Sequence, residues 1–492
     1  MSPPPFLLPL LLLLTLPFPS FPSPTVCIVG GGIGGSSLSH FIRRYSAPQS
    51  NLTLRVFERN AVVGGRMATV TIAGHTFEAG GSILHPKNYY ARNFSEMIGQ
   101  RRPGSERSED GDRGFGIWDG ERFLLRSWSV DSMGGFPFAE KMVSLLNDAM
   151  MFFRYGFSLF KMKTFVEETV GRFLKYYECS DSRPVFETVD EMLKWSGLYN
   201  LTTHTLEEEL ISIGLSPLLI NELITVITRI NYGQSVRISG LAGAVSMAGS
   251  GEDLWAVKGG NWRMAAGLLN QSDVLLHLQE EIVSVSDLGT HYALNSSAGN
   301  SYICEVAVVA TPLDEVDIEF HPPISIPKRK LQHTHATFVR GVLNPAYFGL
   351  KTVVEIPDLI GSIEDPSLPF SSISVLKRHG EKDMTYKVFS RQATEDTLLD
   401  EIFSARQETI RINWGAYPHF DAPEVFAPII LDGRHLYYIN AFENAASTME
   451  TSAVAAENVA RLILLRLHGG LSLGMSDLRG IKSDPTYLHS DL

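Results

Sequence analysis

Cysteine is scarce in this chain, which holds only Cys27, Cys179 and Cys304 among 492 residues. Three is an odd number, and Cys27 and Cys304 lie in apolar runs that are typical of buried strands. We interpret both as small core residues and predict that no disulfide framework supports the fold. The sequence also lacks CxxC and HExxH motifs, so we predict no metal site.

Basic charge is in short supply as well, because 42 Lys and Arg face 54 Asp and Glu and leave a net charge of −12. A nucleic-acid binder needs a basic face, so no nucleic-acid partner is expected.

The leucine-rich run at residues 6–16 is too short to span a bilayer, which takes about 20 residues as a helix. A Pro/Ser cluster follows this run, and the pair is typical of a signal peptide, placed at residues 1–24.

Sequons for N-glycosylation agree with entry into the secretory pathway. They begin at Asn51, Asn93, Asn200, Asn270 and Asn295. We therefore expect a secretory glycoprotein, with the lysosome or vacuole as its destination. Residues 469–492 form a polar tail in which we see no membrane anchor.

The order of the first elements indicates the fold class. A β-branched strand at Thr25–Val29, a glycine turn at Gly30–Ser37, a helix to Tyr45 and a strand at Leu52–Glu58 follow one another. This is the opening of a doubly wound α/β domain. The predicted fold is α/β, with a Rossmann-like FAD-binding domain interleaved with a mixed α+β substrate domain. The FAD-binding segments are 25–100, 273–325 and 426–468, the mostly helical substrate segment is 101–272, and the substrate-domain sheet is 326–425.

Individual elements follow from the apolar periodicity. We expect strands near 273–277, 281–285, 291–295, 302–310, 335–343, 372–376, 386–390 and 435–440. Helices are expected over 141–177, 189–212, 216–230 and 452–467, and a charged surface loop over 101–114.

The glycine turn carries the first chemical signal. In VGGGIGGS, Gly30 makes the turn, Gly32 allows the backbone to approach a pyrophosphate, and Gly35 allows the helix to pack on the strand, with Gly34 between them. Phosphates then lie at the helix N-terminus. Glu58 ends the next strand, where a carboxylate accepts both ribose hydroxyls, and Arg59 follows it. The conjunction predicts a dinucleotide site.

Two more glycine pairs follow at short distances. Gly65 and Arg66 belong to a GGR segment, and Gly80, Gly81 and Ser82 belong to the segment EAGGSILHP. Close backbone approach suits a long cofactor with a flat ring, although each pair alone also fits an ordinary glycine turn.

These segments resemble the FAD-binding elements of the amine oxidase and phytoene desaturase group. The resemblance implies that Val283 lies on a strand that holds the adenine. It also implies that Glu443, Met449 and Glu450 lie near the ribityl and phosphate side. This chain departs from the group's glycine positions at Phe442 and Thr451, which points to a particular branch.

That branch is the prenylcysteine oxidase family, whose plant form is called farnesylcysteine lyase. The segments that resemble it are RINYGQS (229–235), LAGAVSMAGSGEDLWAVKGGN (241–261), WGAYPHF (414–420) and LYYINAFENAASTMETSAVAAEN (436–458), and the resemblance spans about residues 25–467. It implies non-covalent FAD and oxidation of a prenylcysteine by O2 and water to a prenyl aldehyde, cysteine and hydrogen peroxide.

Substrate-side residues are less clearly indicated. His85 is a candidate to accept a proton from water, and Trp414 and Tyr417 are candidate aromatic side chains on either side of the substrate. Structural roles fit these three residues equally well. Lys258 before a Gly-Gly pair is a weaker candidate, and the Met/Phe-rich helix at 142–165 is a candidate wall for the prenyl tail.

Two other readings share parts of this pattern. An amine oxidase shares the cofactor motifs, and the prenyl-binding escort proteins of small GTPases share the fold without redox chemistry. The greasy substrate also makes a peripheral membrane association conceivable.

Overall fold

The computed structural model describes residues 24–46, 52–99, 114–128, 139–178, 183–251, 253–327 and 329–468. The predicted signal peptide, the predicted loop at 101–114 except for Gly114, and the polar tail lie outside these ranges. Among the described residues, no helix is both long enough and apolar enough to cross a bilayer.

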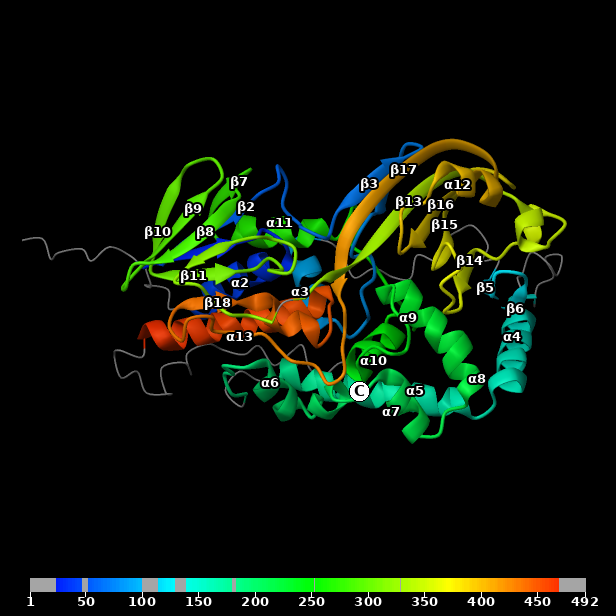
Figure 1. Cartoon of the computed structure of the whole chain (residues 1–492), viewed down its shortest axis with the longest axis horizontal. Helices are drawn as coiled ribbons and strands as arrows, with labels where there is room; N and C mark the ends of the chain where they lie inside the picture. Colours follow the sequence, from blue (N-terminus) through cyan, green and yellow to red (C-terminus); the bar gives the residue numbers. More distant parts are fainter. Residues whose placement is uncertain are drawn as a thin grey trace, which may run out of the picture.

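A parallel sheet forms the centre of the first domain (Figure 1). Its order is β18 (Leu436–Tyr438), β11 (Val306–Val309), β1 (Thr25–Val29), β2 (Thr53–Glu58) and β7 (Leu275–Leu278). Helix α2 (Ile33–Tyr45) follows β1 directly, and the last long helix, α13 (Met449–His468), packs beside it. Three chain segments far apart in sequence thus complete one sheet, as the doubly wound prediction requires.

The second domain is built on a mixed sheet of seven strands. Its order is β17 (Phe403–Pro418), β13 (Leu331–Leu343), β16 (Met384–Ser390), β15 (Ser372–Arg378), β14 (Leu359–Ser362), β5 (Phe115–Trp118) and β6 (Phe123–Arg126). Helices cover its lower side in Figure 1, namely α4 (Ala139–Tyr155), α5 (Ser158–Phe173), α7 (Leu206–Ser212), α9 (Thr225–Tyr232) and α10 (Gly240–Ala248).

Smaller elements complete the structure. The hairpin β3 (Thr69–Ile72) and β4 (His75–Glu78) follows the GGR segment, and α3 (Tyr89–Met97) follows EAGGSILHP. A four-stranded sheet of β10 (Ser301–Cys304), β9 (Tyr292–Ser296), β8 (Ile282–Asp287) and β12 (Glu319–His321) lies beside the parallel sheet.

Several predicted elements differ from the structure for identifiable reasons. The single strand expected at 302–310 is two strands, β10 and β11, which join different sheets. The longest strand, β17, was not predicted, because its polar first half acquires strand structure through pairing with β13. Likewise, β5 and β6 lie in the segment that was expected to be mostly helical.

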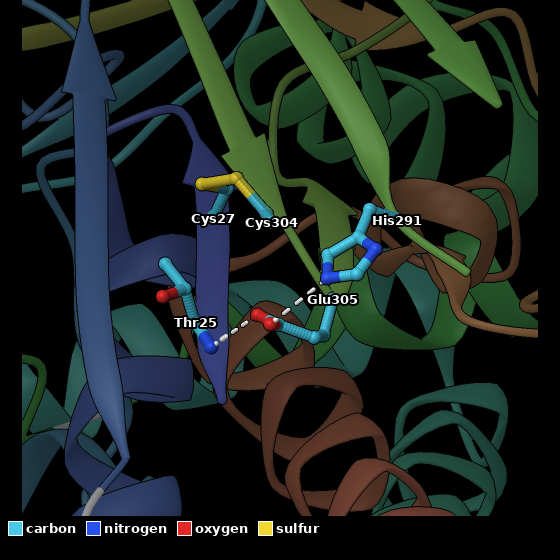
Figure 2. Close-up of a disulfide and its surroundings, with 5 residues drawn as sticks. All are labelled: Thr25, Cys27, His291, Cys304 and Glu305. Atoms are coloured by element: carbon cyan, nitrogen blue, oxygen red, sulfur yellow. Dashed lines mark hydrogen bonds and ion pairs between the residues drawn. A yellow bond between two sulfur atoms is a disulfide. The ribbon is translucent and has the colours of Figure 1, made fainter. Parts of the chain in front are cut away.

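A disulfide joins Cys27 on β1 to Cys304 on β10, so the expectation of two free core cysteines was wrong (Figure 2). The two residues are 277 positions apart, yet their Cα atoms are 5.9 Å apart because β11 pairs with β1 immediately after β10. An odd cysteine count excludes complete pairing, but it does not exclude one bridge. Beside the bridge, Glu305 accepts a hydrogen bond from the Thr25 amide at 2.6 Å.

Candidate cofactor and substrate site

One cavity of about 860 Å³ extends from the glycine turn to the inner face of the seven-stranded sheet. Its first part is lined by the predicted cofactor segments, including Gly30, Gly32, Gly34, Glu58, Arg59, Gly65, Arg66, Gly80, Gly81 and Ser82. Its second part is lined by α5, α9, α10 and cavity-facing side chains of β13, β15, β16 and β17. The two domains therefore share a single chamber.

The glycine turn has the geometry that a dinucleotide needs. Gly30 has a φ of +114°, and a Cβ there would lie 2.6 Å from the carbonyl oxygen of Ala310. A Cβ on Gly35 would overlap the carbonyl of Gly30. Helix α2 begins at Ile33 after Gly32, which supplies no side-chain cap. The first amides of α2 are therefore free to bind an anion.

Glu58 at the end of β2 is held in place beside this turn. One carboxylate oxygen accepts the Gly31 amide at 3.0 Å, and the other accepts the backbone and side-chain N–H groups of Asn60 at 2.9 and 2.7 Å. Glu58 is only 5% exposed and still contributes to the cavity wall. This position fits the predicted ribose acid, while Arg59 is exposed at the same wall.

Arg66 and Glu443, predicted as separate cofactor contacts, form a pair with each other. Their side chains meet at 2.5 Å, and Arg66 also donates to the Ala416 carbonyl at 2.8 Å. Burial tends to raise the pKa of Glu443, but the Arg66 charge and hydrogen bonds from Asn440 and Ser447 outweigh it and lower the pKa. Glu443 therefore stays ionised behind a wall that Asn440 and Ser447 line.

The segment at Gly80 and Gly81 packs tightly against Arg66. A Cβ on Gly80 would overlap the Arg66 carbonyl, and the Gly81 amide donates to the same oxygen at 2.9 Å. Asn261 donates to the Gly81 carbonyl at 2.9 Å. Sequence reasoning missed Asn261, a fully buried residue, although it follows a Gly-Gly pair that could have signalled it. Met449 lies beside Gly81 at the start of α13.

The predicted cofactor residues Glu450 and Val283 lie on α13 and on β8, respectively. Glu450 accepts the amides of Tyr90 and Ala91 at 2.7 and 3.0 Å and the Tyr177 hydroxyl at 2.5 Å. Burial raises the pKa of Glu450 to about 7. Its carboxylate thus ties α13 to α3, although it also borders the cavity. The Val283 side chain is 38% exposed, and its neighbour Ile282 lines the cavity instead.

The three candidate catalytic residues all line the cavity. His85 Nδ1 accepts the Lys87 amide at 3.1 Å, and burial, aided by the Lys87 charge, lowers the His85 pKa. A neutral ring that accepts at Nδ1 carries its proton on Nε2, so His85 is set up to donate rather than to accept. This favours a binding or structural role over the predicted role as a base.

The aromatic candidates lie on β17. Trp414 Nε1 is buried without a hydrogen-bond partner among the described residues. Tyr417 packs against Tyr232 with ring centroids 4.8 Å apart, and burial raises its pKa. Lys258, by contrast, is exposed and lies outside the cavity wall.

The apolar part of the chamber comes from residues outside the predicted wall at 142–165. Its lining residues are Val170 and Phe173 in the second half of α5, Leu174 directly after α5, Ile230 on α9, and Leu241, Ala244, Val245 and Ala248 on α10. In the predicted wall at 142–165, Phe153, Phe157 and Phe160 are 87%, 74% and 60% exposed. That prediction was wrong, because a helix with apolar residues around much of its surface does not reveal which side faces the protein.

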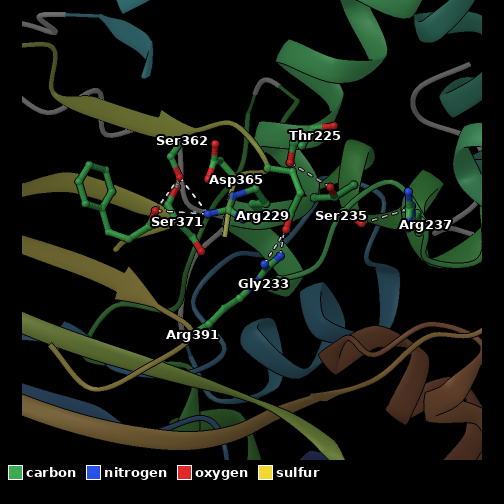
Figure 3. Close-up of polar contacts among 12 residues, drawn as sticks. Thr225, Arg229, Gly233, Ser235, Arg237, Ser362, Asp365, Ser371 and Arg391 are labelled. Atoms are coloured by element: carbon green, nitrogen blue, oxygen red, sulfur yellow. Dashed lines mark hydrogen bonds and ion pairs between the residues drawn. The ribbon is translucent and has the colours of Figure 1, made fainter. Parts of the chain in front are cut away.

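Arg229 and Arg391, both drawn in Figure 3, line part of the chamber wall. Arg229 on α9 is 2% exposed, and it shares the carboxylate of Glu364 with Arg391 at 2.7 Å each. Arg229 also donates to Ser362 at 3.1 Å, and Arg391 donates to the Gly233 carbonyl at 2.6 Å. These contacts brace α9 against the sheet and leave each guanidinium paired.

Comparison with known proteins adds relatives along almost the whole chain. The family described as prenylcysteine lyase matches residues 138–473, and an NAD(P)-binding Rossmann-like domain matches residues 28–100. Farnesylcysteine lyase of Arabidopsis thaliana is 61% identical over 95% of this chain and 93% of its own length. Prenylcysteine oxidase 1 of Homo sapiens is 31% identical over 91% of this chain and 90% of its own.

The fold of this chain resembles those of solved oxidase structures. A putrescine oxidase triple mutant covers 90% of this chain and 99% of its own with a TM-score of 0.57 at 14% identity. Cyclohexylamine oxidase from Brevibacterium oxydans covers 91% of this chain and 100% of its own with a TM-score of 0.56 at 16% identity. At these identities the likeness establishes the architecture only.

Proposed function

The chain belongs to the prenylcysteine lyase family, and we propose that it is an FAD-dependent oxidase that cleaves the thioether of prenylcysteines. Prenylcysteine, water and O2 are converted to prenyl aldehyde, free cysteine and hydrogen peroxide. The observation that carries this proposal is the single cavity that joins a dinucleotide cradle to an apolar chamber between α5, α9 and α10.

The residues present fit FAD. Gly30, Gly32, Gly34 and Gly65 line the cavity without side chains, so backbone is open to a close cofactor there, and Glu58 is positioned for a ribose. The second glycine segment, at Gly80 and Gly81, suits the flavin-bearing half of the FAD molecule. Bound FAD supplies a two-electron oxidation of the carbon next to sulfur, with O2 as the final acceptor.

The chain's own residues position the substrate and control water. Burying a 15-carbon tail contributes up to ~10 kcal/mol at ~0.8 kcal/mol per carbon, less the entropy of ordering the chain. The apolar side chains of α10 and the second half of α5 provide that burial. Neutral His85 offers a hydrogen-bond donor at the cavity wall, where it can orient water or the departing thiol.

An anaerobic titration tests the activity. Residues 25–492 expressed in a secretory host are mixed with farnesylcysteine without oxygen, and the visible spectrum is recorded before and after air is admitted. The proposal is supported if farnesylcysteine bleaches the flavin absorption and air restores it, with one hydrogen peroxide formed per farnesylcysteine oxidised. Flavin absorption that farnesylcysteine leaves unchanged, but that a polyamine bleaches, would replace it with an amine oxidase.

We also propose that the enzyme works in an oxidising compartment of the secretory pathway, with the lysosome or vacuole as its destination. The Cys27–Cys304 disulfide supports this, because such bridges persist outside the cytosol.

Among the predicted glycosylation sites, Asn200 and Asn270 are exposed, whereas the Asn295 side chain donates a hydrogen bond to Ser284 at 3.0 Å. Glycosidase treatment of protein from the native host should shift its mass. Asn200→Gln and Asn270→Gln should each reduce that shift, while an unchanged mass would contradict the proposal.

Peripheral binding to a lipid surface is the last part of the proposed function. An exposed ridge supports it, which we define as Leu145, Phe153, Phe157 and Phe160 on α4 and α5. The rings of Phe157 and Phe160 lie 6.2 Å apart, and Lys161 and Lys163 are exposed on the same helix. Aromatic side chains beside lysines suit a membrane interface. Because α5 also lines the chamber, a substrate with a lipid tail would have a short path from bilayer to site.

Vesicle flotation tests this surface. The protein should float with phosphatidylcholine vesicles that contain phosphatidylserine, and Phe153→Ser combined with Phe157→Ser should remain at the bottom. Val425→Ser, at a residue 66% exposed outside the ridge, is the matched control. Equal flotation of the ridge variant and the control would exclude the ridge as the contact, and concentration-dependent dimers lost in the ridge variant would indicate a second copy instead.

A further inference from the structure

Lys387 is a buried cation on the cavity face of the seven-stranded sheet. It is 9% exposed on β16 and, with Phe389, lines the cavity, whereas Tyr386 and Val388 between them enter the core on the other face. This alternation is the ordinary strand pattern. It aims the lysine side chain into the substrate chamber.

The amine of Lys387 is without a polar partner in the part of the chain that the structure describes. Among the described residues, no hydrogen bond or ion pair involves it, and its recorded contact is with the Phe389 ring, whose centroid is 4.8 Å from Nζ. Glu78 is the acidic group that influences it electrostatically, at more than ion-pair distance. One oxygen of Glu78 accepts the Asn261 amide at 2.6 Å, and the other is buried without a partner.

The other buried cations of the chamber are already neutralised. Arg66 is paired with Glu443, and Arg229 and Arg391 share Glu364. Arg59 and Lys87 also border the cavity, but both are exposed to solvent. Lys387 therefore stands out in the described wall as a desolvated positive charge with a vacant hydrogen-bonding position.

A buried cation without a partner costs stability. Burial lowers the pKa of Lys387 to about 8, although the charge of Glu78 opposes the shift. The amine is consequently still mostly protonated near neutral pH. An apolar residue would pack better beside Phe389 and its neighbours. The presence of a charged lysine there therefore indicates that a bound anionic ligand, not a residue of the protein, neutralises it.

We propose that Lys387 binds the α-carboxylate of the prenylcysteine substrate. This inference rests on the proposed function, because the ligand it names has an apolar tail and one carboxylate at the opposite end. The tail lies against α5 and α10, and the carboxylate lies against the sheet. Ser374, paired with Lys387 across β15 and β16, and Ser372 place hydroxyl groups on the same wall. A charge-assisted hydrogen bond in such a dry site selects strongly for the free acid.

Paired substrates test this assignment. Farnesylcysteine and its methyl ester differ only in the charge that Lys387 would bind. The kcat/KM of the wild type should favour the acid by about ten- to a hundredfold, the range expected for a charge-assisted hydrogen bond. In Lys387→Met the ratio should fall toward one, with the loss in KM for the acid, and Lys387→Arg should restore part of it. Lys382→Met, an exposed lysine beside the start of β16, is the matched control.

The dissociation constant of the acid, measured by intrinsic fluorescence on anaerobic enzyme whose flavin has been reduced beforehand so that the acid is not oxidised, provides a readout other than turnover. It should rise in Lys387→Met and not in the control. A wild type that treats acid and ester alike, or a Lys387→Met variant that keeps the wild-type ratio, overturns the assignment. A wild type that oxidises neither compound overturns the proposed function itself, so the two failures are distinguishable even if Lys387→Met does not fold.

Discussion

The two halves of the cavity recognise their ligands by different means. In the cofactor half, the contacts come from backbone in glycine turns and from carboxylates whose positions are fixed by neighbours close in sequence, as in Glu58 with Gly31 and Asn60. In the substrate half, the wall is assembled from strands and helices more than 200 residues apart, such as α5 and β16.

The halves also differ in how completely their polar groups are paired. Glu58 and Glu443 have several partners each. In the substrate half, no hydrogen bond or ion pair among the described residues involves the Lys387 amine, and Trp414 Nε1 is buried without a partner among the same residues. The chain itself thus holds the carboxylates of the cofactor half in place, whereas polar side chains of the substrate half are left available to a ligand.

The largest effect is expected in the cofactor half from Gly30→Ala. The added Cβ would collide with the Ala310 carbonyl at a φ of +114°, so bound flavin and activity should both fall at least about a hundredfold. The ratio of flavin to protein absorbance measures the loss. Gly171→Ala on α5, where a Cβ would meet nothing within 4 Å, should keep its flavin, and a Gly30→Ala enzyme with full flavin would refute the close-approach role.

Next in size is Arg66→Met, which leaves Glu443 buried at 4% exposure without its cation. Breaking a buried pair costs about 3–5 kcal/mol, so the urea midpoint should fall substantially. The double variant with Glu443→Leu should recover much of that loss. If the single and double variants unfold alike, the pair does not act as a unit.

Loss of the Cys27–Cys304 disulfide should lower the free energy of unfolding by a somewhat smaller amount. Cys27→Ala removes the link between β1 and β10, and about 2–4 kcal/mol of unfolding free energy should be lost. Dithiothreitol should lower the melting temperature of the wild type to that of the variant and leave the variant unchanged. A reductant effect of equal size on both proteins would count against the bridge.

The smallest effect has the opposite sign and belongs to the substrate half. The folded-state pKa of Lys387, about 8, lies below that of an unfolded lysine, so stability is present above the unfolded value and is lost as pH falls through about 8. Lys387→Met should therefore raise the unfolding free energy at pH 7, by roughly 1–3 kcal/mol, and the gain should vanish by about pH 10. Urea melts at both pH values check this, and destabilisation at pH 7 would mean that the protein itself satisfies the charge.

Sequence reasoning found the cofactor half more completely than the substrate half. The glycine turn, Glu58 and the return of β11 and β18 to the sheet followed from local patterns. It missed Asn261, Lys387, the partnership of Arg66 with Glu443 and the bridge at Cys27. Each of these depends on a contact between distant segments, for which a single sequence carries no local signal.

The amino-acid sequence by itself determined the α/β fold, the dinucleotide turn and the family, because glycines with left-handed φ and a strand-end acid are requirements of nearby backbone. Only the tertiary structure decided which helices enclose the chamber, that the apolar ridge of α4 and α5 faces outward, and that Lys387 points inward without a partner among the described residues. Periodicity shows that a segment has an apolar face, but packing against the rest of the chain decides what that face meets.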